Sequence, residues 1–313
     1  MKQTDRQHKG IHHISVLAGD AQRNAEFYVQ KLGMRLVKKS VNQDDPGTYH
    51  LFYGNAEGSP GSGLTFFPWP MARQGKPGVG ESVAVGLSVP SGSENYWAEH
   101  LESAGIRLDT YTDLFGKKAL FFRDPDGLQL ILVIDERVDS IPHWEQSSVP
   151  SGAAIRGFWG TTLRLNDHTA TAAILKELFS FEETAQDGRS RLYTTDAPIG
   201  GSVILEEADP MPSSNGRGTV HHVAFRAKDD EELESMRQKV IAMGMQPTAH
   251  IDRHWFHSIY FHTPGGVLFE IATDGPGYAV DEDADKLGQK LILPPWLESR
   301  RETIENRLPV ISV

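Results

Sequence analysis

The sequence predicts an α+β fold built from four consecutive βαβββ modules, and three observations support this prediction. The order of one strand, one helix and further strands recurs along the 313-residue chain. An apolar strand that opens with two adjacent histidines occurs near the start, in GIHHISVLAGD, and again much later, in GTVHHVAFRAKDD. In both copies the second histidine, His13 or His222, lies seven residues before an aspartate. Such repetition indicates that one structural unit is used several times.

The first module begins with an apolar strand over residues 11–18. Asp20 suits the N-cap of a helix predicted over residues 21–31, because its side chain can accept hydrogen bonds from the first helical turn. Gly33 ends this helix, since glycine readily adopts the left-handed conformation that follows a helix. Turns rich in Asp, Pro, Gly and Ser separate three more strands, which we predict at residues 34–41, 49–53 and 64–67.

The second module repeats this order. A strand at residues 82–89 precedes a helix at residues 94–104, which ends at Gly105. The Asp-Pro-Asp-Gly sequence at residues 124–127 has the composition of a tight turn. The three strands that complete the module are predicted at residues 109–114, 119–123 and 128–134.

The third and fourth modules follow the same pattern. The third is predicted as a strand at 157–165, a helix at 169–179 and a final strand at 203–206. The fourth is predicted as a strand at 220–227, a helix at 231–243 and strands at 246–252, 256–262 and 267–272. The Thr-Pro-Gly-Gly turn at residues 263–266 lies where the second module has Asp-Pro-Asp-Gly.

The modules group into two sequence halves. Residues 136–153 are rich in Ser, Pro and charge, which is typical of a linker. We therefore expect an N-terminal half at 10–135 and a C-terminal half at 154–278. Residues 279–313 are expected to form a C-terminal extension that packs on the second half.

The composition excludes several classes of function. A net charge of −11 argues against nucleic acids and anionic membranes, because both bind basic surfaces. The chain has no cysteine, so disulfides and thiolate metal sites are excluded. No apolar run reaches the length of a membrane span, and the first residues lack the apolar segment of a signal peptide. We expect a cytoplasmic protein with no nucleic-acid or membrane partner.

Four βαβββ modules with a histidine on the first strand resemble the vicinal oxygen chelate superfamily, which includes glyoxalase I and extradiol dioxygenases. The resemblance covers about Gly10 to Gly277. It implies that pairs of modules form curved sheets, each able to cup a divalent metal. It also implies that the metal ligands come from the first and last strands of a module.

Comparison of equivalent positions in the four modules indicates which residues would bind the metal. The histidine position holds His13 in the first module and His222 in the fourth. The second and third modules offer Val83 and Gly160 there. On the last strands, only the fourth module has a carboxylate at the implied position, Glu270. The corresponding residues of the other modules are Phe67, Ile131 and Leu205, and Glu206 lies one place later, where a strand side chain faces the opposite side.

Two histidines and one carboxylate around one metal form the facial triad of non-haem Fe(II) oxygenases. A lone histidine on a strand is more often a core or surface residue than a ligand. Here, however, His13 and His222 occupy matched positions, and Glu270 lies in an otherwise apolar strand. We therefore predict that modules 1 and 4 together bind the metal, while modules 2 and 3 form a metal-free partner cup.

Within the superfamily, the chain most resembles the hydroquinone ring-cleaving dioxygenases, which include dichlorohydroquinone and methylhydroquinone dioxygenases. Both histidine pairs carry this resemblance, as do four C-terminal fragments. These fragments are Asp-Arg at 252–253, Ser-Ile-Tyr-Phe at 258–261, Pro-Gly-Gly at 264–266 and Phe-Glu-Ile-Ala-Thr-Asp at 269–274.

The resemblance implies Fe(II) on His13, His222 and Glu270, with Mn(II) as the alternative metal. It implies a small aromatic diol of the hydroquinone type and O2 as substrates. A homodimer is the assembly that the general frequency of two-fold oligomers favours. The further residues that the resemblance implicates are Tyr260 in proton transfer, Arg253 in stabilising negative charge, and Ser15 in substrate binding. It also implicates His12 and His221, either in proton transfer or in bracing the strands that carry the ligands. Strand periodicity places Ser15 on the face of His13 but His12 and His221 on the opposite face, so those two would need a twist or bulge to reach the site.

Other functions remain open from the sequence. One is a catechol-type extradiol dioxygenase with an unusual source of ligands. Another is a glyoxalase-like metal-dependent lyase or a binding protein. A glyoxalase would need a second glutamate where this chain has Thr65, Phe66 and Phe67, and a binding protein would not need the triad.

Overall fold

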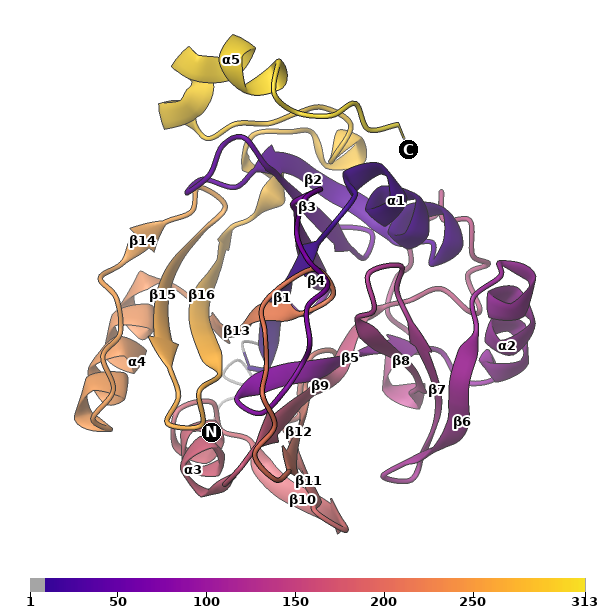
Figure 1. The fold of residues 1–313 in the computed structure, drawn as a ribbon, viewed down its shortest axis with the longest axis vertical. Coiled ribbons are helices and arrows are strands. Elements are labelled where there is room, and N and C mark those ends of the chain that lie inside the picture. The colour runs from indigo at the N-terminus through magenta and orange to yellow at the C-terminus, as the bar shows by residue number, and fades with distance from the viewer. Residues whose placement is uncertain (1–8, 313) are drawn as a thin grey trace.

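The computed structural model describes residues 9–312 and contains two curved eight-stranded sheets (Figure 1). The first sheet has the order β14-β15-β16-β13-β1-β4-β3-β2 and joins the fourth module to the first. Its strands are β1 (Ile11–Ala18), β2 (Arg35–Val41), β3 (Tyr49–Gly54), β4 (Gly63–Pro68), β13 (Val220–Ala227), β14 (Ile251–Asp252), β15 (Phe256–His262) and β16 (Leu268–Pro276).

The second sheet has the order β10-β11-β12-β9-β5-β8-β7-β6 and joins the third module to the second. Its strands are β5 (Glu81–Val89), β6 (Leu108–Leu114), β7 (Lys117–Arg123), β8 (Gln129–Ile134), β9 (Gly157–Leu165), β10 (Glu182–Asp187), β11 (Ser190–Thr194) and β12 (Ser202–Glu207). The predicted fold class and the pairing of modules 1 with 4 and 2 with 3 are therefore confirmed.

One helix follows the first strand of every module, as predicted. Asp20 caps α1 by accepting a hydrogen bond from the Arg23 amide, and Asp229 caps α4 through the Glu232 amide. The helices are α1 (Ala21–Ala25), which continues as a π-helix over Glu26–Lys31, then α2 (Glu94–Ser103), α3 (Thr169–Glu177), α4 (Asp230–Ala242) and the short α5 (Arg301–Glu305). No helix within residues 9–312 is both long and apolar enough to cross a membrane.

Three parts of the sequence prediction were incomplete. Strands β10 and β11 were not predicted, because β10 (EETAQD) is polar and largely exposed and lacks an apolar alternation. Strand β14 covers two residues instead of the predicted seven, since Pro247 cannot donate to a sheet ladder. The C-terminal extension packs mainly on the first module instead of the second half, where Ile292 N–H donates to Lys39 O and Lys38 Nζ binds Asp281.

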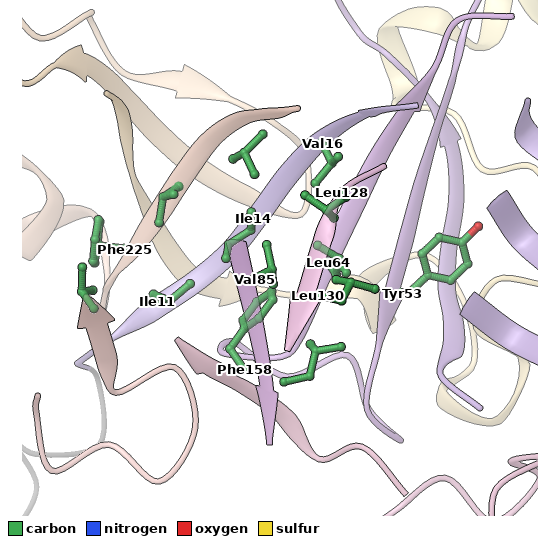
Figure 2. Packing of buried hydrophobic residues seen from close by; sticks show 14 of the residues in the cluster. Ile11, Ile14, Val16, Tyr53, Leu64, Val85, Leu128, Leu130, Phe158 and Phe225 are labelled. Atoms are coloured by element: carbon green, nitrogen blue, oxygen red, sulfur yellow. The ribbon is translucent and has the colours of Figure 1, made fainter. Parts of the chain in front are cut away.

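The convex sides of both sheets share one hydrophobic core (Figure 2). Ile14 and Val16 of β1 and Phe225 of β13 enter this core from the first sheet, and Val85 and Phe158 enter it from the second. Alternation along β1 directs His13 and Ser15 to the other side, into the concave face. The core therefore fixes which residues of β1 face the cup.

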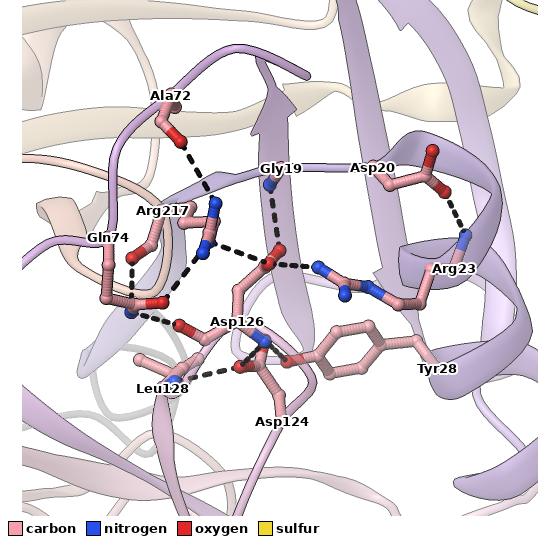
Figure 3. A network of polar contacts seen from close by, with 10 residues as sticks. All are labelled: Gly19, Asp20, Arg23, Tyr28, Ala72, Gln74, Asp124, Asp126, Leu128 and Arg217. Atoms are coloured by element: carbon pink, nitrogen blue, oxygen red, sulfur yellow. Dashed lines mark hydrogen bonds and ion pairs between the residues drawn. The ribbon is translucent and has the colours of Figure 1, made fainter.

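A polar network links the first module to the turn between β7 and β8 (Figure 3). The buried carboxylate of Asp126 accepts hydrogen bonds from Gly19 N–H at 2.8 Å and from Arg23 at 2.5 Å. Arg217, from the segment that leads into β13, lies 3.7 Å from the same carboxylate. The turn residue Asp126 thus connects three modules.

Asp124, two residues earlier, is the second anchor of this turn. Its carboxylate accepts hydrogen bonds from Tyr28 Oη at 3.1 Å and from the backbone amides of Asp126 and Leu128. Burial raises the pKa of Asp124 from 3.8 to about 6, although these hydrogen bonds oppose the shift.

We expect Asp126→Ala to lower the free energy of unfolding by about 1–3 kcal/mol, because the Gly19 amide loses its partner in a buried position. Urea denaturation measures the change. Asp109→Ala is the matched control, because its ion pair with Arg123 is exposed and contributes about 0–1 kcal/mol. Equal losses in the two variants would show that Asp126 is not an anchor.

The raised pKa of Asp124 predicts a pH dependence of stability. Between pH 3.8 and about 6 the folded chain holds a proton that the unfolded chain has released. This contribution is complete below pH 3.8 and is lost as the pH rises through 6, with a total of roughly 3 kcal/mol. Urea denaturation from pH 4 to 7 should therefore show a smaller gain on acidification in Asp124→Asn than in the wild type. Parallel profiles would contradict this prediction.

Candidate metal centre

Three predicted ligand atoms converge on the concave face of the first sheet. The Nε2 atoms of His13 and His222 lie 3.2 Å apart, and Glu270 Oε2 lies 3.2 Å from the first and 2.9 Å from the second. All three side chains are buried, with 0–5% of their surface exposed. Among the described residues, these are the His, Asp and Glu side chains that come together closely enough to hold a metal.

The strand register brings these residues together. In the antiparallel pair of β1 and β13, His13 lies opposite Ala224 and Ser15 lies opposite His222. Strand β16 runs parallel to β13 and places Glu270 beside Ala224. The ligand atoms therefore come from three adjacent strands, although His13 and His222 are 209 residues apart in sequence.

The chemistry of this group fits a divalent metal. Neither carboxylate oxygen of Glu270 accepts an aligned hydrogen bond from the described part of the chain. Burial would raise the pKa of Glu270, but the two imidazoles outweigh this effect and hold it well below its usual value. An ionised, fully buried carboxylate requires a cation. Ligand bonds of about 2.0–2.2 Å at right angles would place neighbouring ligand atoms about 3 Å apart, as found here.

Two β-bulges explain how His12 and His221 reach the site. The ladder between β1 and β13 steps from Ile11 opposite Phe225 to His13 opposite Ala224, so His12 is an extra residue. A second step leaves His221 unpaired between Val220 and His222. An extra residue breaks the alternation of side chains, which is how a bulge redirects a neighbouring group.

Each bulged histidine contacts the adjacent ligand. His12 Nδ1 lies 2.9 Å from His13 Nδ1, and His221 Nδ1 lies 2.7 Å from His222 Nδ1. These contacts leave Nε2 of both ligands for a metal, and metal-bound histidines usually donate their other N–H to such a partner. Burial and then His13 lower the pKa of His12 to about 3, and burial and then His222 lower that of His221 to about 4. Both partners are therefore neutral at pH 7, and Nδ1 of each can accept a hydrogen bond from the neighbouring histidine when that histidine carries its proton on Nδ1.

The second cup has the same bulges but no ligands. The β5–β9 ladder has its extra residues at Val83 and Trp159. The counterpart of His13 is therefore Ala84, and the alignment with Val83 was wrong. The parallel pairs place Ile131 and Ile204 at the position of Glu270, so the equivalence with Leu205 was wrong. A cavity of about 470 Å³ lies here, with Ala84, Ile131 and Ile204 in its wall together with charged side chains such as Arg123, Arg164 and Glu206. Gly160 replaces His222, and a Cβ atom there would lie 2.0 Å from Ser202 O.

The strand register also shows that Phe67 was wrongly aligned with Glu270. Thr65 pairs with Ser15 as Glu270 pairs with Ala224, so Thr65 is the counterpart of Glu270 in the first module. Its hydroxyl lies 2.8 Å from Ser15 Oγ. Counting from the aspartates and turns misaligned these positions because loop lengths differ between modules.

A cavity of about 220 Å³ opens beside the three ligands. Six aromatic side chains form much of its wall: Phe52, Phe67, Trp69, Trp255, Phe256 and Tyr260. An apolar cavity of about 150 Å³ can hold one benzene molecule, so this space suits a single substituted ring. Ser15 is fully buried and is not among the lining residues.

Tyr260 and Arg253 lie together in this cavity. The Tyr260 ring lies 5.5 Å from the His222 ring, and its hydroxyl is 3.4 Å from Arg253 Nε. Burial and then Glu270 raise the pKa of Tyr260, so its phenol is protonated at neutral pH. Arg253 also donates to Asp44 at 3.2 Å. The structure therefore brings both predicted residues to the cavity.

His50 was missed by the sequence prediction. It lies on β3, lines the cavity, and its Nε2 is 2.9 Å from Thr65 Oγ1. The available signal was weak, because His50 is one polar residue in an aromatic strand and has no histidine at the matching position of another module.

Comparisons with known proteins agree with this geometry. The sequence model of the Glyoxalase/Bleomycin resistance protein/Dioxygenase superfamily matches residues 10–132 and 159–271. The chain is 41% identical over 302 residues to the Bacillus subtilis protein named "Putative ring-cleaving dioxygenase MhqE", covering 96% of this chain and 98% of that one. It is 32% identical over 312 residues to a chlorohydroquinone/hydroquinone 1,2-dioxygenase of Sphingobium indicum, covering 97% of each.

Solved structures show the same fold. A crystal structure of a "putative dioxygenase" from Bacillus subtilis superposes with a TM-score of 0.95 at 39% identity, covering 98% of this chain and 99% of that one. Glyoxalase I from Zea mays superposes with a TM-score of 0.61 at 16% identity over 85% of this chain and 92% of that one, which is a likeness of fold alone.

We expect His12→Phe to lower the affinity for a divalent metal by about 10–100-fold, because His13 loses the acceptor that orients its ring. Anaerobic titration with Fe(II) measures this change. His168→Phe is the control, since His168 pairs with Glu207 on the opposite half of the molecule. Unchanged affinity in His12→Phe would contradict the bracing role.

Proposed function

Because the chain belongs to the Glyoxalase/Bleomycin resistance protein/Dioxygenase superfamily, we propose that it is a ring-cleaving dioxygenase that acts on hydroquinone-type diols with O2. One observation carries this proposal: His13, His222 and Glu270 converge beside a cavity with aromatic walls. The names of the relatives from Bacillus subtilis and Sphingobium indicum support the same reaction class.

Fe(II) is the metal that this donor set favours, and Mn(II) is the alternative. Two imidazoles and one carboxylate are the protein ligands of non-haem Fe(II) oxygenases. His13, His222 and Glu270 would hold the ion. Such a metal would supply O2 activation and would lower the pKa of a hydroxyl group bound to it.

The other residues of the cavity bind and orient the substrate. The aromatic walls exclude water from the ring and favour a planar ligand. Tyr260 holds a proton on Oη and can donate it within the cavity, while Arg253 supplies a fixed positive charge next to it. His12 and His221 orient the ligand imidazoles through Nδ1.

Ser15 has a different role from the predicted substrate contact. It is buried behind Thr65, so it supports that side chain instead of touching the substrate. Thr65 also argues against a glyoxalase-like lyase with four protein ligands, because a threonine occupies the place of the second carboxylate.

We expect the Fe(II)-loaded protein to consume O2 when hydroquinone or a chlorinated or methylated hydroquinone is added, and to form an acyclic product. An oxygen electrode and mass spectrometry measure the two events. Catechol and a thiol adduct of methylglyoxal are the comparison substrates. Uptake with catechol alone would favour a catechol-type extradiol enzyme, and the absence of uptake with every diol would overturn the dioxygenase proposal.

Tyr260→Phe should lower kcat by about 10²–10⁴-fold while leaving metal binding unchanged, because it removes the proton donor but keeps the ring. The neighbouring Phe261 cannot supply a control variant for Tyr260, because it is buried in the hydrophobic core. Tyr111→Phe on exposed β6 changes the same chemical group far from the cavity and should leave kcat unaltered.

A further inference from the structure

His50 is held rigidly at the edge of the cavity. Its ring lies between two aromatic side chains, with centroid distances of 3.8 Å to Phe52 and 4.1 Å to Phe67. Its Nε2 atom is 2.9 Å from Thr65 Oγ1. These contacts fix both the position and the rotation of the imidazole.

A chain of hydrogen bonds joins Ser15, Thr65 and His50. It lies where the first module has no counterpart of the Glu270 carboxylate. Thr65 is the counterpart of Glu270, and its hydroxyl bridges Ser15 Oγ at 2.8 Å and His50 Nε2. Ser15 and Thr65 are fully buried, whereas His50 lines the cavity. The chain of hydrogen bonds therefore presents His50 to a bound ligand.

Nδ1 is the atom that His50 can offer. Among the hydrogen bonds of residues 9–312, the His50 side chain takes part through Nε2, which contacts Thr65 Oγ1, and Nδ1 is left for a ligand. In the neighbouring β2–β3 loop, Asn42 Oδ1 accepts from the Asp44 amide, Gln43 Nε2 donates to Arg253 O, and Asp44 binds the Arg253 guanidinium. His50 is thus a cavity residue with an unused ring nitrogen.

A para-diol requires such a group. Its two hydroxyls lie at opposite ends of the ring, so one metal cannot bind both. The second hydroxyl must leave water and enter a cavity with aromatic walls, which is costly unless it finds a hydrogen-bond partner there. A hydroxyl both donates and accepts, so it can pair with either tautomer of His50.

We propose that Nδ1 of His50 binds the substrate hydroxyl that is remote from the metal, and that His50 thereby selects hydroquinones over monophenols. This assignment rests on the proposed function, because it presumes that one hydroxyl of a diol is held by the metal. His50 then acts as a specificity residue, positioned by Thr65 and Ser15.

Two amide variants separate the two ring nitrogens. Asparagine places its amide near the position of Nδ1, and glutamine places its amide near the position of Nε2. His50→Asn should therefore keep a group for the substrate and lose the contact with Thr65, whereas His50→Gln should do the reverse. His50→Phe keeps the packing between Phe52 and Phe67 and removes both nitrogens.

The test measures anaerobic binding of hydroquinone and of 4-methylphenol, which lacks the second hydroxyl, to the Fe(II)-loaded protein. The wild type should bind hydroquinone about three- to tenfold more tightly than 4-methylphenol, as expected for one neutral hydrogen bond. His50→Asn should retain most of this preference, and His50→Gln and His50→Phe should lose it while their affinity for 4-methylphenol stays within about twofold of the wild type.

Three results would overturn the proposal. Retention of the wild-type preference in His50→Phe would show that another group binds the remote hydroxyl. Equal loss of affinity for both ligands in all three variants would assign His50 a structural role. A wild type that binds neither ligand but retains Fe(II) would contradict the proposed function itself, and the His50 assignment would fall with it.

Discussion

The antiparallel pairing of β1 with β13 is the constraint on which the functional site depends. It places the first module beside the fourth and brings His13 within 3.2 Å of His222. Glu270 joins them because β16 pairs in parallel with β13. A fully buried carboxylate facing two imidazoles would be stabilised by a bound cation, so a metal held here would stabilise this sheet.

The two cups have the same backbone arrangement but different residues at the candidate ligand positions. Both central ladders carry a pair of bulges, and in the first cup these bulges turn His12 and His221 onto the ligand histidines. The second cup keeps the bulges at Val83 and Trp159 but has Ala84, Gly160 and an isoleucine at the ligand positions. The bulges are therefore common to both cups, and the cups differ in the residues at the candidate ligand positions.

The sequence predicted most of the architecture because the modules repeat. Matched positions identified His13 and His222 as a pair and required modules 1 and 4 to be neighbours, which the sheet order confirms. A bulge was expected only as the condition for His12 and His221 to reach the site, because nothing in the local composition of HH or FW marks an extra residue. His50 was missed for a related reason: a single polar residue becomes informative only when its neighbours in space are known.

The turn at residues 124–127 shows a second limit of sequence patterns. Its composition predicted a turn, but its two aspartates also anchor the second module to the first through Tyr28, Gly19 and Arg23. Long-range contacts of this kind depend on the relative placement of whole modules, which residue propensities do not encode.

The most direct test of the account is a crystal structure of the Fe(II)-loaded protein, with anomalous scattering recorded at the iron absorption edge. We expect one iron per chain, bound by Nε2 of His13, Nε2 of His222 and a carboxylate oxygen of Glu270 at about 2.0–2.2 Å. Iron bound in the second cup, away from these three residues, would contradict the proposal.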